Sequence, residues 1–379
     1  MISITKSMQL WISVSLGLCF TSLTAYGWGE RGHDLITRVA AHILEKKGPD
    51  VAPLSRIINQ KQFMLGHLSN TPDIVWRSAE KPVTSSNSPT HYIDLEFVLQ
   101  PKQIMNPTAW PKNINELEKA IATQCSTKNK DFACAPGKTL SKQMKKTGHA
   151  PWRVEQLLNA MSANLKNLGH KNPDPNTVKK NVDDALLYAG LASHFIGDLA
   201  NPHHTSKNYD GWDTGNGGLH SYFETDIVNT YPMGFDKEVL EWALANKPYR
   251  KLQQQFNLNS KSSRHKVAFA LAANSYSYLG QLHSIDDKHA IIKRSSNEHG
   301  LKIKAKRASP DKVKASFKDF TKSRLALSAD TLANLWLEAW IRAGKPKLNG
   351  YFSYYYPVKP DYVWPNYLND GSNKKSTSL

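Results

Sequence analysis

Apolar side chains recur every three to four residues along most of the chain, which is the spacing of one face of a helix. The stripes are clearest in residues 35–44, 182–199, 267–282 and 325–341. The alternation of apolar and polar residues that is typical of strands is scarce, and its best example is residues 92–97. These patterns predict an all-α fold, with a single mostly helical domain and long loops.

Helix breakers and polar stretches separate these stripes. Asn201-Pro202 ends the helix predicted up to about Ala200, and residues 205–219 are rich enough in Gly and Asn to be a loop. Residues 288–324 are rich in Lys and Arg, which fits either a solvated insertion or a face that binds polyanions. We expect a main domain over residues 28–345 and a C-terminal extension over residues 346–379, disordered from residue 370 onward.

The first 27 residues have the pattern of a secretory signal peptide. Lys6 is the only charged residue before Glu30, an apolar stretch runs over residues 10–23, and residues 25–27 have the small-x-small form of a cleavage site. The apolar run is short for a membrane span, which needs about 20 residues. Cleavage is therefore favoured over an uncleaved anchor. We expect a secreted or periplasmic protein whose mature chain starts at Trp28.

The net charge indicates the kinds of binding partner, and the cysteine content limits the kinds of metal ligand. The chain of 379 residues carries a net charge of +17, which favours contact with nucleic acid, anionic membranes or surface glycans. Outside the predicted signal, the cysteines are Cys125 and Cys134. In an exported chain they predict one disulfide, although two free thiols would fit the sequence as well. Two thiolates cannot build a thiolate zinc cage, so a metal must be held by His and carboxylate ligands.

Histidines and carboxylates gather between residues 194 and 224, namely His194, Asp198, His203, His204, His220 and Glu224. His194 and Asp198 are four residues apart on a predicted helix and share a face, and His220 and Glu224 repeat this spacing. An isolated His on an apolar helix is more often a core residue than a ligand. Two buried carboxylates without partners, however, would cost much free energy. Zinc would supply the partner, and the cluster offers more ligands than one ion needs.

The chain resembles the zinc-dependent phospholipases C and the fungal-type single-strand-specific nucleases, a superfamily of trinuclear zinc phosphoesterases with one mostly helical fold. The family pattern is an N-terminal Trp, a His soon after it, an Asp, a His, then His-x3-Asp-x5-His and His-x3-Asp or Glu. In the same order this chain has Trp28, His33, Asp73, His91, His194, Asp198, His204, His220 and Glu224. The resemblance spans roughly residues 28–228, with a weaker echo at residues 332–343.

The resemblance implies three zinc ions. The first would be held by Asp73, His91, His194 and Asp198. Asp198 would bridge to the second, which His33 and the amino group and carbonyl of Trp28 would also bind. The third would be held by His204, His220 and Glu224. A free amino group on Trp28 requires signal cleavage directly before it. Asp73 would either orient or deprotonate the attacking water, or act as a ligand alone.

The same resemblance implies hydrolysis of phosphate esters by the domain of residues 28–345, with two substrate branches. Glu224, where the nucleases usually have Asp, and the short gap between His204 and His220 favour a phospholipase C-like enzyme that releases diacylglycerol and a phosphorylated headgroup. The start Trp28-Gly-Glu-Arg-Gly-His33 and the basic charge favour a single-strand endonuclease with 3′-nucleotidase activity.

We expect the phospholipase C-like activity, with the nuclease as the alternative and a zinc-stabilised binding protein without catalysis as a third possibility. The substrate is then a phospholipid membrane surface or a single-stranded nucleic acid, and no obligate protein partner is evident. Tyr92 and Asp94 are the candidate substrate contacts, Tyr92 through stacking on a base or a cation–π contact with a headgroup.

Overall fold

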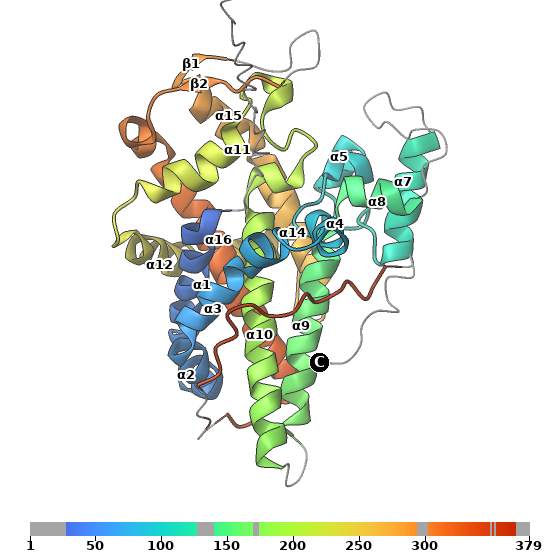
Figure 1. Ribbon diagram of the computed structural model, residues 1–379, viewed down its shortest axis with the longest axis vertical. Coiled ribbons are helices and arrows are strands. Elements are labelled where there is room, and N and C mark those ends of the chain that lie inside the picture. Colours follow the sequence, from blue (N-terminus) through green and yellow to red (C-terminus); the bar gives the residue numbers. More distant parts are fainter. Residues whose placement is uncertain are drawn as a thin grey trace, which may run out of the picture.

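The computed structural model describes residues 28–126, 140–169, 174–293, 302–348, 351 and 354–368 (Figure 1). Within these residues, helices account for nearly all regular structure, which confirms the all-α prediction. Three sequence-based predictions fall outside the described residues: the signal peptide at residues 1–27, the pairing of Cys125 with Cys134, and the tail from residue 370.

The longer helices are α1 (Gly29–Glu45), α3 (Gln62–Thr71), α7 (Ile114–Ser126), α9 (Ala150–Asn167), α10 (Pro175–Ala200), α12 (Phe235–Asn246), α14 (Arg264–Ser277) and α16 (Pro310–Arg342). The shorter helices are α2 (Ala52–Gln60), α4 (Lys81–Asn87), α5 (Leu95–Val98), α6 (Pro101–Ile104), α8 (Leu140–Thr147), α11 (Leu219–Ser221), α13 (Pro248–Gln255) and α15 (Leu279–Asp287). Single 3₁₀ or π turns are η1 (Pro49–Val51), η2 (Pro72–Trp76), η3 (Ser88–Thr90), η4 (Pro202–Thr205), η5 (Trp212–Thr214) and η6 (Tyr222–Ile227). The strands β1 (Ala290–Ile292) and β2 (Lys306–Arg307) form an antiparallel pair.

Helix α10 is the central helix of the bundle. It packs against α9, α3, α16, α14 and α1, and Figure 1 shows it beside α9. The Asp174 carboxylate caps its first turn by accepting a hydrogen bond of 2.8 Å from the Thr177 amide. From Asn181 to Ala200 almost every side chain is buried, as the apolar stripe predicts. No helix in the described part of the chain has the length and hydropathy needed to cross a bilayer.

Two glycines let α10 approach its neighbours closely. A Cβ at Gly190 would lie 2.6 Å from the Leu68 Cβ on α3, and a Cβ at Gly197 would lie 2.8 Å from Nδ1 of His33 on α1. Both distances are too short for carbon and its neighbours, so only glycine fits. The His33 ring therefore packs directly on the α10 backbone, one residue away from Asp198.

Residues 92–97 do not form the strand that their alternation suggests. Residues 95–98 make the single helical turn α5, which buries most of its side chains. The amides of Ile93 and Asp94 donate to the carbonyls of His204 and Thr147, at 2.9 and 2.8 Å, and neither acceptor lies on a strand. The extended backbone before α5 is thus held by the turn η4 and by the end of α8 instead of by a sheet.

The basic segment of residues 288–324 consists of two unlike parts. Its described residues before Pro310 include the β1–β2 hairpin, and from Pro310 onward the chain belongs to α16. Val313, Phe317 and Phe320 in the first turns of α16 are buried. Only the first part is therefore an exposed insertion, and the second part contributes to the core.

Residues 354–368 contain no helix or strand and lie across the bundle, as the dark red trace in Figure 1 shows. Backbone carbonyls of this segment accept hydrogen bonds from side chains of three earlier elements: Val358 from His67 (2.9 Å), Pro360 from Trp76 (3.1 Å) and Trp364 from Gln156 (2.7 Å). The segment therefore joins α3, η2 and α9 on one side of the molecule.

Candidate metal centre

The eight predicted ligand side chains come from seven segments of the chain and meet in the interior. All eight are buried: His33 of α1, Asp73 of η2, His91 after η3, His194 and Asp198 of α10, His204 of η4, His220 of α11 and Glu224 of η6. Segments far apart in sequence thus converge on the C-terminal end of α10, where Asn201 and Pro202 turn the chain and deliver His204 to the same place.

The ligand atoms form three groups, and within each group they lie within 4.8 Å of one another. The groups are His33 with Asp73 and His194, His91 with His194 and Asp198, and His204 with His220 and Glu224. His194 belongs to the first two groups, so these two overlap. The third is adjacent, because His204 Nε2 lies 3.8 Å from Asp198 Oδ1. The described residues therefore contain a possible multinuclear metal site.

Asp198 lies at the centre of this arrangement. Its Oδ1 is 3.4 Å from Nε2 of His33. Its Oδ2 is 3.0 Å from Nδ1 of His91 and 3.2 Å from Nε2 of His194. The two oxygens of one carboxylate thus face different sets of nitrogens, which is the arrangement of a carboxylate that bridges two cations.

Backbone carbonyls fix the tautomers of two histidines. Nδ1 of His194 lies 2.7 Å from the Ser69 carbonyl, and Nδ1 of His204 lies 2.9 Å from the His91 carbonyl. A carbonyl can only accept, so each Nδ1 carries a proton and each Nε2 is the nitrogen left to bind a metal ion. Nε2 lies 3.2 Å from Oδ2 of Asp198 in His194 and 3.8 Å from Oδ1 of Asp198 in His204, so both atoms face the site, as in histidines that bind metals.

Several buried polar atoms of the site have no hydrogen-bond partner within the described part of the chain. They are both ring nitrogens of His33, Oδ1 of Asp198, Nε2 of His204 and Oε1 of Glu224. Each such atom costs about 1–3 kcal/mol when it is buried alone. Cations at the three groups would pair these atoms, so the residues fit divalent metal ions. Nitrogen and oxygen donors of this kind suit zinc.

The electrostatics of the site agree with metal binding. Burial lowers the pKa of His91 and of His220 to about 4, which keeps both imidazoles in the neutral form that binds metals. Burial acts to raise the pKa of Asp198, but the charges of His194 and His204 outweigh it and hold this pKa well below its usual value. Burial raises the pKa of Glu224 to about 8, so without a cation this group retains its proton at neutral pH.

Trp28 is fully buried close to these ligands. Its ring packs against Phe223 with centroids 5.2 Å apart, and its Nε1 donates to the Gly197 carbonyl at 2.7 Å. Gly197 precedes Asp198, so the start of the predicted mature chain lies beside the bridging carboxylate. Ligation by the Trp28 amino group stays a prediction.

A cavity of about 500 Å³ adjoins the centre, and His91, His204 and His220 form part of its wall. The rest of the lining combines cations with aromatic rings: Arg77, Lys146 and Lys207 with Tyr92, Phe97 and Tyr209, together with Thr84, Ser88, Asp94 and His203. A ligand in this cavity would meet both the ligand histidines and positive charges, which suits an anionic ligand.

The two predicted substrate contacts, Tyr92 and Asp94, both line this cavity. The Tyr92 hydroxyl donates to the Lys145 carbonyl at 2.7 Å, so the ring is the part of Tyr92 available for contact. Burial raises the pKa of Asp94 well above its usual value, and the charge of Glu96 adds to this. The Asp94 carboxyl can therefore act as a hydrogen-bond donor.

Two residues of the site, Arg77 and Asn201, were not identified as functional residues from the sequence. Arg77 places Nη2 3.0 Å from Oδ1 of Asp73, and its spacing of four residues after Asp73 could have indicated the pair. Asn201, interpreted only as a helix stop, donates from Nδ2 to Oε2 of Glu224 at 2.8 Å. His203, which the sequence placed in the cluster but outside the ligand sets, lines the cavity, and its Nε2 lies 3.4 Å from Nε2 of His283.

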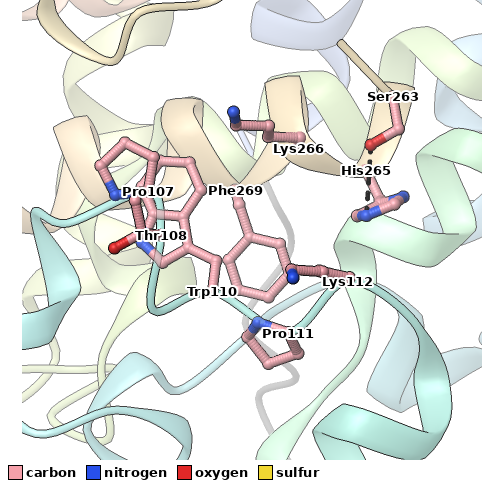
Figure 2. A pocket seen from close by; sticks show the side chains of 9 residues that line it. All are labelled: Pro107, Thr108, Trp110, Pro111, Lys112, Ser263, His265, Lys266 and Phe269. Atoms are coloured by element: carbon pink, nitrogen blue, oxygen red, sulfur yellow. Dashed lines mark hydrogen bonds between the residues drawn. The ribbon is translucent and has the colours of Figure 1, made fainter.

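A second cavity, of about 470 Å³, lies away from the centre between residues 107–112 and the start of α14 (Figure 2). Trp110 and Phe269 line it, but both side chains are almost wholly buried. Its histidine, His265, is paired with Glu155 at 3.0 Å and with the Ser263 hydroxyl at 3.2 Å. None of the metal-ligand groups found among the described residues lies in its lining, so we place the functional site at the first cavity.

Comparison of the chain with protein-family models, curated proteins and solved structures finds no match. The assignment of a possible multinuclear metal site therefore rests on the three ligand groups and their geometry.

Proposed function

We propose that the protein is a secreted, zinc-dependent phosphodiester hydrolase with phospholipase C-like activity. The main support for this proposal is the position of Asp198, whose two carboxylate oxygens lie close to residues of all three ligand groups. Zinc ions bound there would polarise phosphoryl oxygens, lower the pKa of a water molecule and stabilise the leaving oxygen of an in-line displacement.

The proposed ligand sets divide the eight converging side chains and Trp28 among three ions. Asp73, His91, His194 and Asp198 would hold one ion, Asp198, His33 and Trp28 a second, and His204, His220 and Glu224 a third. Export and cleavage before Trp28 would free the amino group for the second set. The overlap of the first two groups at His194 supports two ions close together.

We propose that Asp73 contacts the attacking water and that Arg77 contacts a phosphate oxygen of the substrate. Burial acts to raise the pKa of Asp73, but the charges of Arg77 and His194 outweigh it and lower this pKa. The ionised carboxylate can accept a hydrogen bond from the attacking water. Arg77 lines the cavity, and its guanidinium can donate to a phosphate oxygen.

The walls of the cavity support a phospholipid substrate. Lys146 and Lys207 offer positive charge to the phosphate, while Phe97 and Tyr209 present apolar surface. A substrate that joins an anionic phosphodiester to an apolar body satisfies both kinds of wall. The rings of Tyr92 and Tyr209 also favour a second candidate, a single-strand nuclease, because bases stack on such rings for about 1–3 kcal/mol each.

Parallel assays of the zinc-loaded chain that starts at Trp28 test the proposal. The substrates are phosphatidylcholine vesicles and single-stranded RNA and DNA, each with and without chelator. Chelator-sensitive release of phosphocholine is the expected result. Cleavage of nucleic acid alone would transfer the same site to the nuclease reaction, and the absence of phosphodiester hydrolysis in every assay would contradict the proposal.

A further inference from the structure

The short strands β1 and β2 and the residues next to them expose large apolar side chains. Ile291 is 61% exposed, Ile292 is 41% exposed, and Ile303, just before β2, is 42% exposed. Large aliphatic side chains scattered singly on a surface need no explanation, but a local group of them is typical of an interaction surface. We call the described residues 290–293 and 302–307 the hairpin arms.

Lysines flank these isoleucines on both hairpin arms. Lys293, Lys302, Lys304 and Lys306 are all exposed. Lys293 pairs with Asp287 at 2.7 Å, whereas within the described residues no carboxylate lies within 4 Å of the other three ammonium groups. Exposed apolar side chains beside exposed cations complement an anionic lipid interface, where alkyl groups enter the acyl boundary and ammonium groups meet the headgroups.

The base of the hairpin is fixed to the core by Arg307. Its Nε and Nη2 donate to the buried Asp286 carboxylate at 2.7 and 2.9 Å, and Nη2 also donates to the Asn216 carbonyl at 2.6 Å. The Ala305 amide donates to the Gly217 carbonyl at 2.8 Å. These bonds attach the hairpin arms to the loop that leads into α11 and its ligand His220.

The hairpin also reaches the rim of the metal-centre cavity. Nζ of Lys302 lies 2.6 Å from the Tyr209 hydroxyl and 4.8 Å from the centre of the Tyr209 ring, and Tyr209 lines that cavity. Figure 1 shows β1 and β2 at the same end of the molecule as α11 and α15. A surface that binds to the hairpin arms would therefore lie next to the cavity mouth.

We propose that the hairpin arms dock the protein on an anionic phospholipid surface and hold the cavity mouth against it. The isoleucines decide the class of partner, because a nucleic acid strand would engage the lysines but has no apolar layer for three aliphatic side chains. The role in delivering substrate rests on the proposed phospholipase function, whereas the docking itself is a property of the hairpin arms.

Vesicle co-sedimentation of the zinc-loaded protein tests the docking. The vesicles are phosphatidylcholine alone or with about 30 mol% phosphatidylglycerol, a proportion that gives a strongly negative surface. We compare Ile291→Ser/Ile303→Ser and Lys304→Gln/Lys306→Gln with the control Ile341→Ser/Lys251→Gln, whose exposed residues lie on α16 and α13. Hydrolysis of the soluble ester bis(p-nitrophenyl) phosphate is measured in every variant.

We expect the wild type and the control to bind the anionic vesicles at least about 10-fold more strongly than either hairpin variant, which corresponds to about 1.4 kcal/mol. The thermal unfolding of all variants should be unchanged, since the substituted side chains are exposed. Equal vesicle binding by the wild type and both hairpin variants would overturn the proposal. Loss of single-stranded RNA binding in the lysine variant, with vesicle binding intact, would also overturn it.

The readouts separate the docking from the proposed activity. Vesicle binding that depends on the isoleucines, in a protein that releases no headgroup, would support the docking surface and contradict the phospholipase assignment. Headgroup release at wild-type rates by variants that bind vesicles normally would support the phospholipase and contradict the docking surface.

Discussion

Nε2 of His33 lies 3.4 Å from Oδ1 of Asp198, although the two residues belong to different helices. The contact exists because Gly197 has no side chain to hold α1 and α10 apart. A cation held between these atoms would therefore link α1 to the central helix α10. Metal binding and the stability of the fold should be coupled through this pair.

Replacement of Asp198 tests the bridging role. Asp198→Asn keeps the size of the side chain but removes the charge that two ions would share. We expect zinc content to fall by up to two ions per chain and phosphodiester hydrolysis to fall at least about 100-fold, the upper end of the effect of losing an outer partner of a ligand. The matched control is Asp184→Asn on the same helix, which loses only an ion pair with Lys180. Full zinc content and wild-type rates in Asp198→Asn would refute the bridging assignment.

The start of the chain offers a test that leaves every side chain intact. An additional methionine before Trp28 would convert the proposed amino ligand into an amide, which does not bind zinc. We expect lower zinc content and at least about 10-fold lower activity than in the chain that begins at Trp28. Proteolytic removal of the added residue should restore both quantities. Equal zinc content and activity in the two forms would remove Trp28 from the ligand set.

Asn201 should strengthen zinc binding by the third ligand group without itself binding the metal. Its Nδ2 donates to Oε2 of Glu224 at 2.8 Å, so Asn201→Ala leaves this carboxylate less well oriented. We expect zinc affinity at this group to fall about 10–100-fold, measured by competition with a chelator. Asn164→Ala is the control, because Asn164 donates only to the Ala160 carbonyl on its own helix. Equal affinities in the two variants would contradict this role.

The C-terminal segment should stabilise the fold around Arg153. The Arg153 guanidinium is fully buried and lies 5.7 Å from the Tyr362 ring and 5.3 Å from the Phe195 ring, and Phe195 contacts the ring of His91. Truncation after residue 353 uncovers Arg153 and breaks at least five hydrogen bonds between this segment and earlier elements. We expect the free energy of unfolding in urea to fall by about 5 kcal/mol, at roughly 1 kcal/mol for each bond. Truncation after Leu368 is the control and should leave stability unchanged.

The raised pKa of Asp94 predicts how the stability of the fold changes with pH. Burial raises the pKa of Asp94 in the folded state. At pH values above the usual pKa of this group, the folded protein therefore binds more protons than the unfolded chain. The free energy of unfolding falls for this reason as the pH rises through the folded pKa. Asp94→Asn removes this loss. We expect the Tm of the variant to exceed that of the wild type by about 2 °C or more at pH 8 and the difference to disappear near pH 4. A variant less stable than the wild type at pH 8 would contradict this assignment.

The sequence predicted those parts of the molecule that depend on local spacing. The apolar stripes correspond to α1, α10, α16 and the pair α14 and α15, and the spacing of four residues puts His194 and Asp198 on one helix face. The family order of ligands also anticipated that His33, Asp73 and His91 would join them. These residues lie far from α10 in sequence, so periodicity alone could not have placed them there.

The features that the sequence missed depend on long-range contacts. The alternation in residues 92–97 suggested a strand, but its backbone bonds go to His204 and Thr147, whose positions the local pattern cannot reveal. The basic residues after Pro310 suggested an insertion, yet Phe317 and Phe320 are buried by their packing in the bundle. Asn201 appeared only as a helix stop, because its contact with Glu224 requires two turns of the chain to meet.

The most direct test measures zinc content and hydrolysis of bis(p-nitrophenyl) phosphate in the same sample of the chain that begins at Trp28. The measurement is made on the purified protein, after dialysis against chelator, and after zinc is restored. We predict about three zinc ions per chain, loss of metal and activity together, and recovery of both with zinc. A protein that binds no zinc, or that hydrolyses the ester equally well without it, would contradict a metal centre built on Asp198.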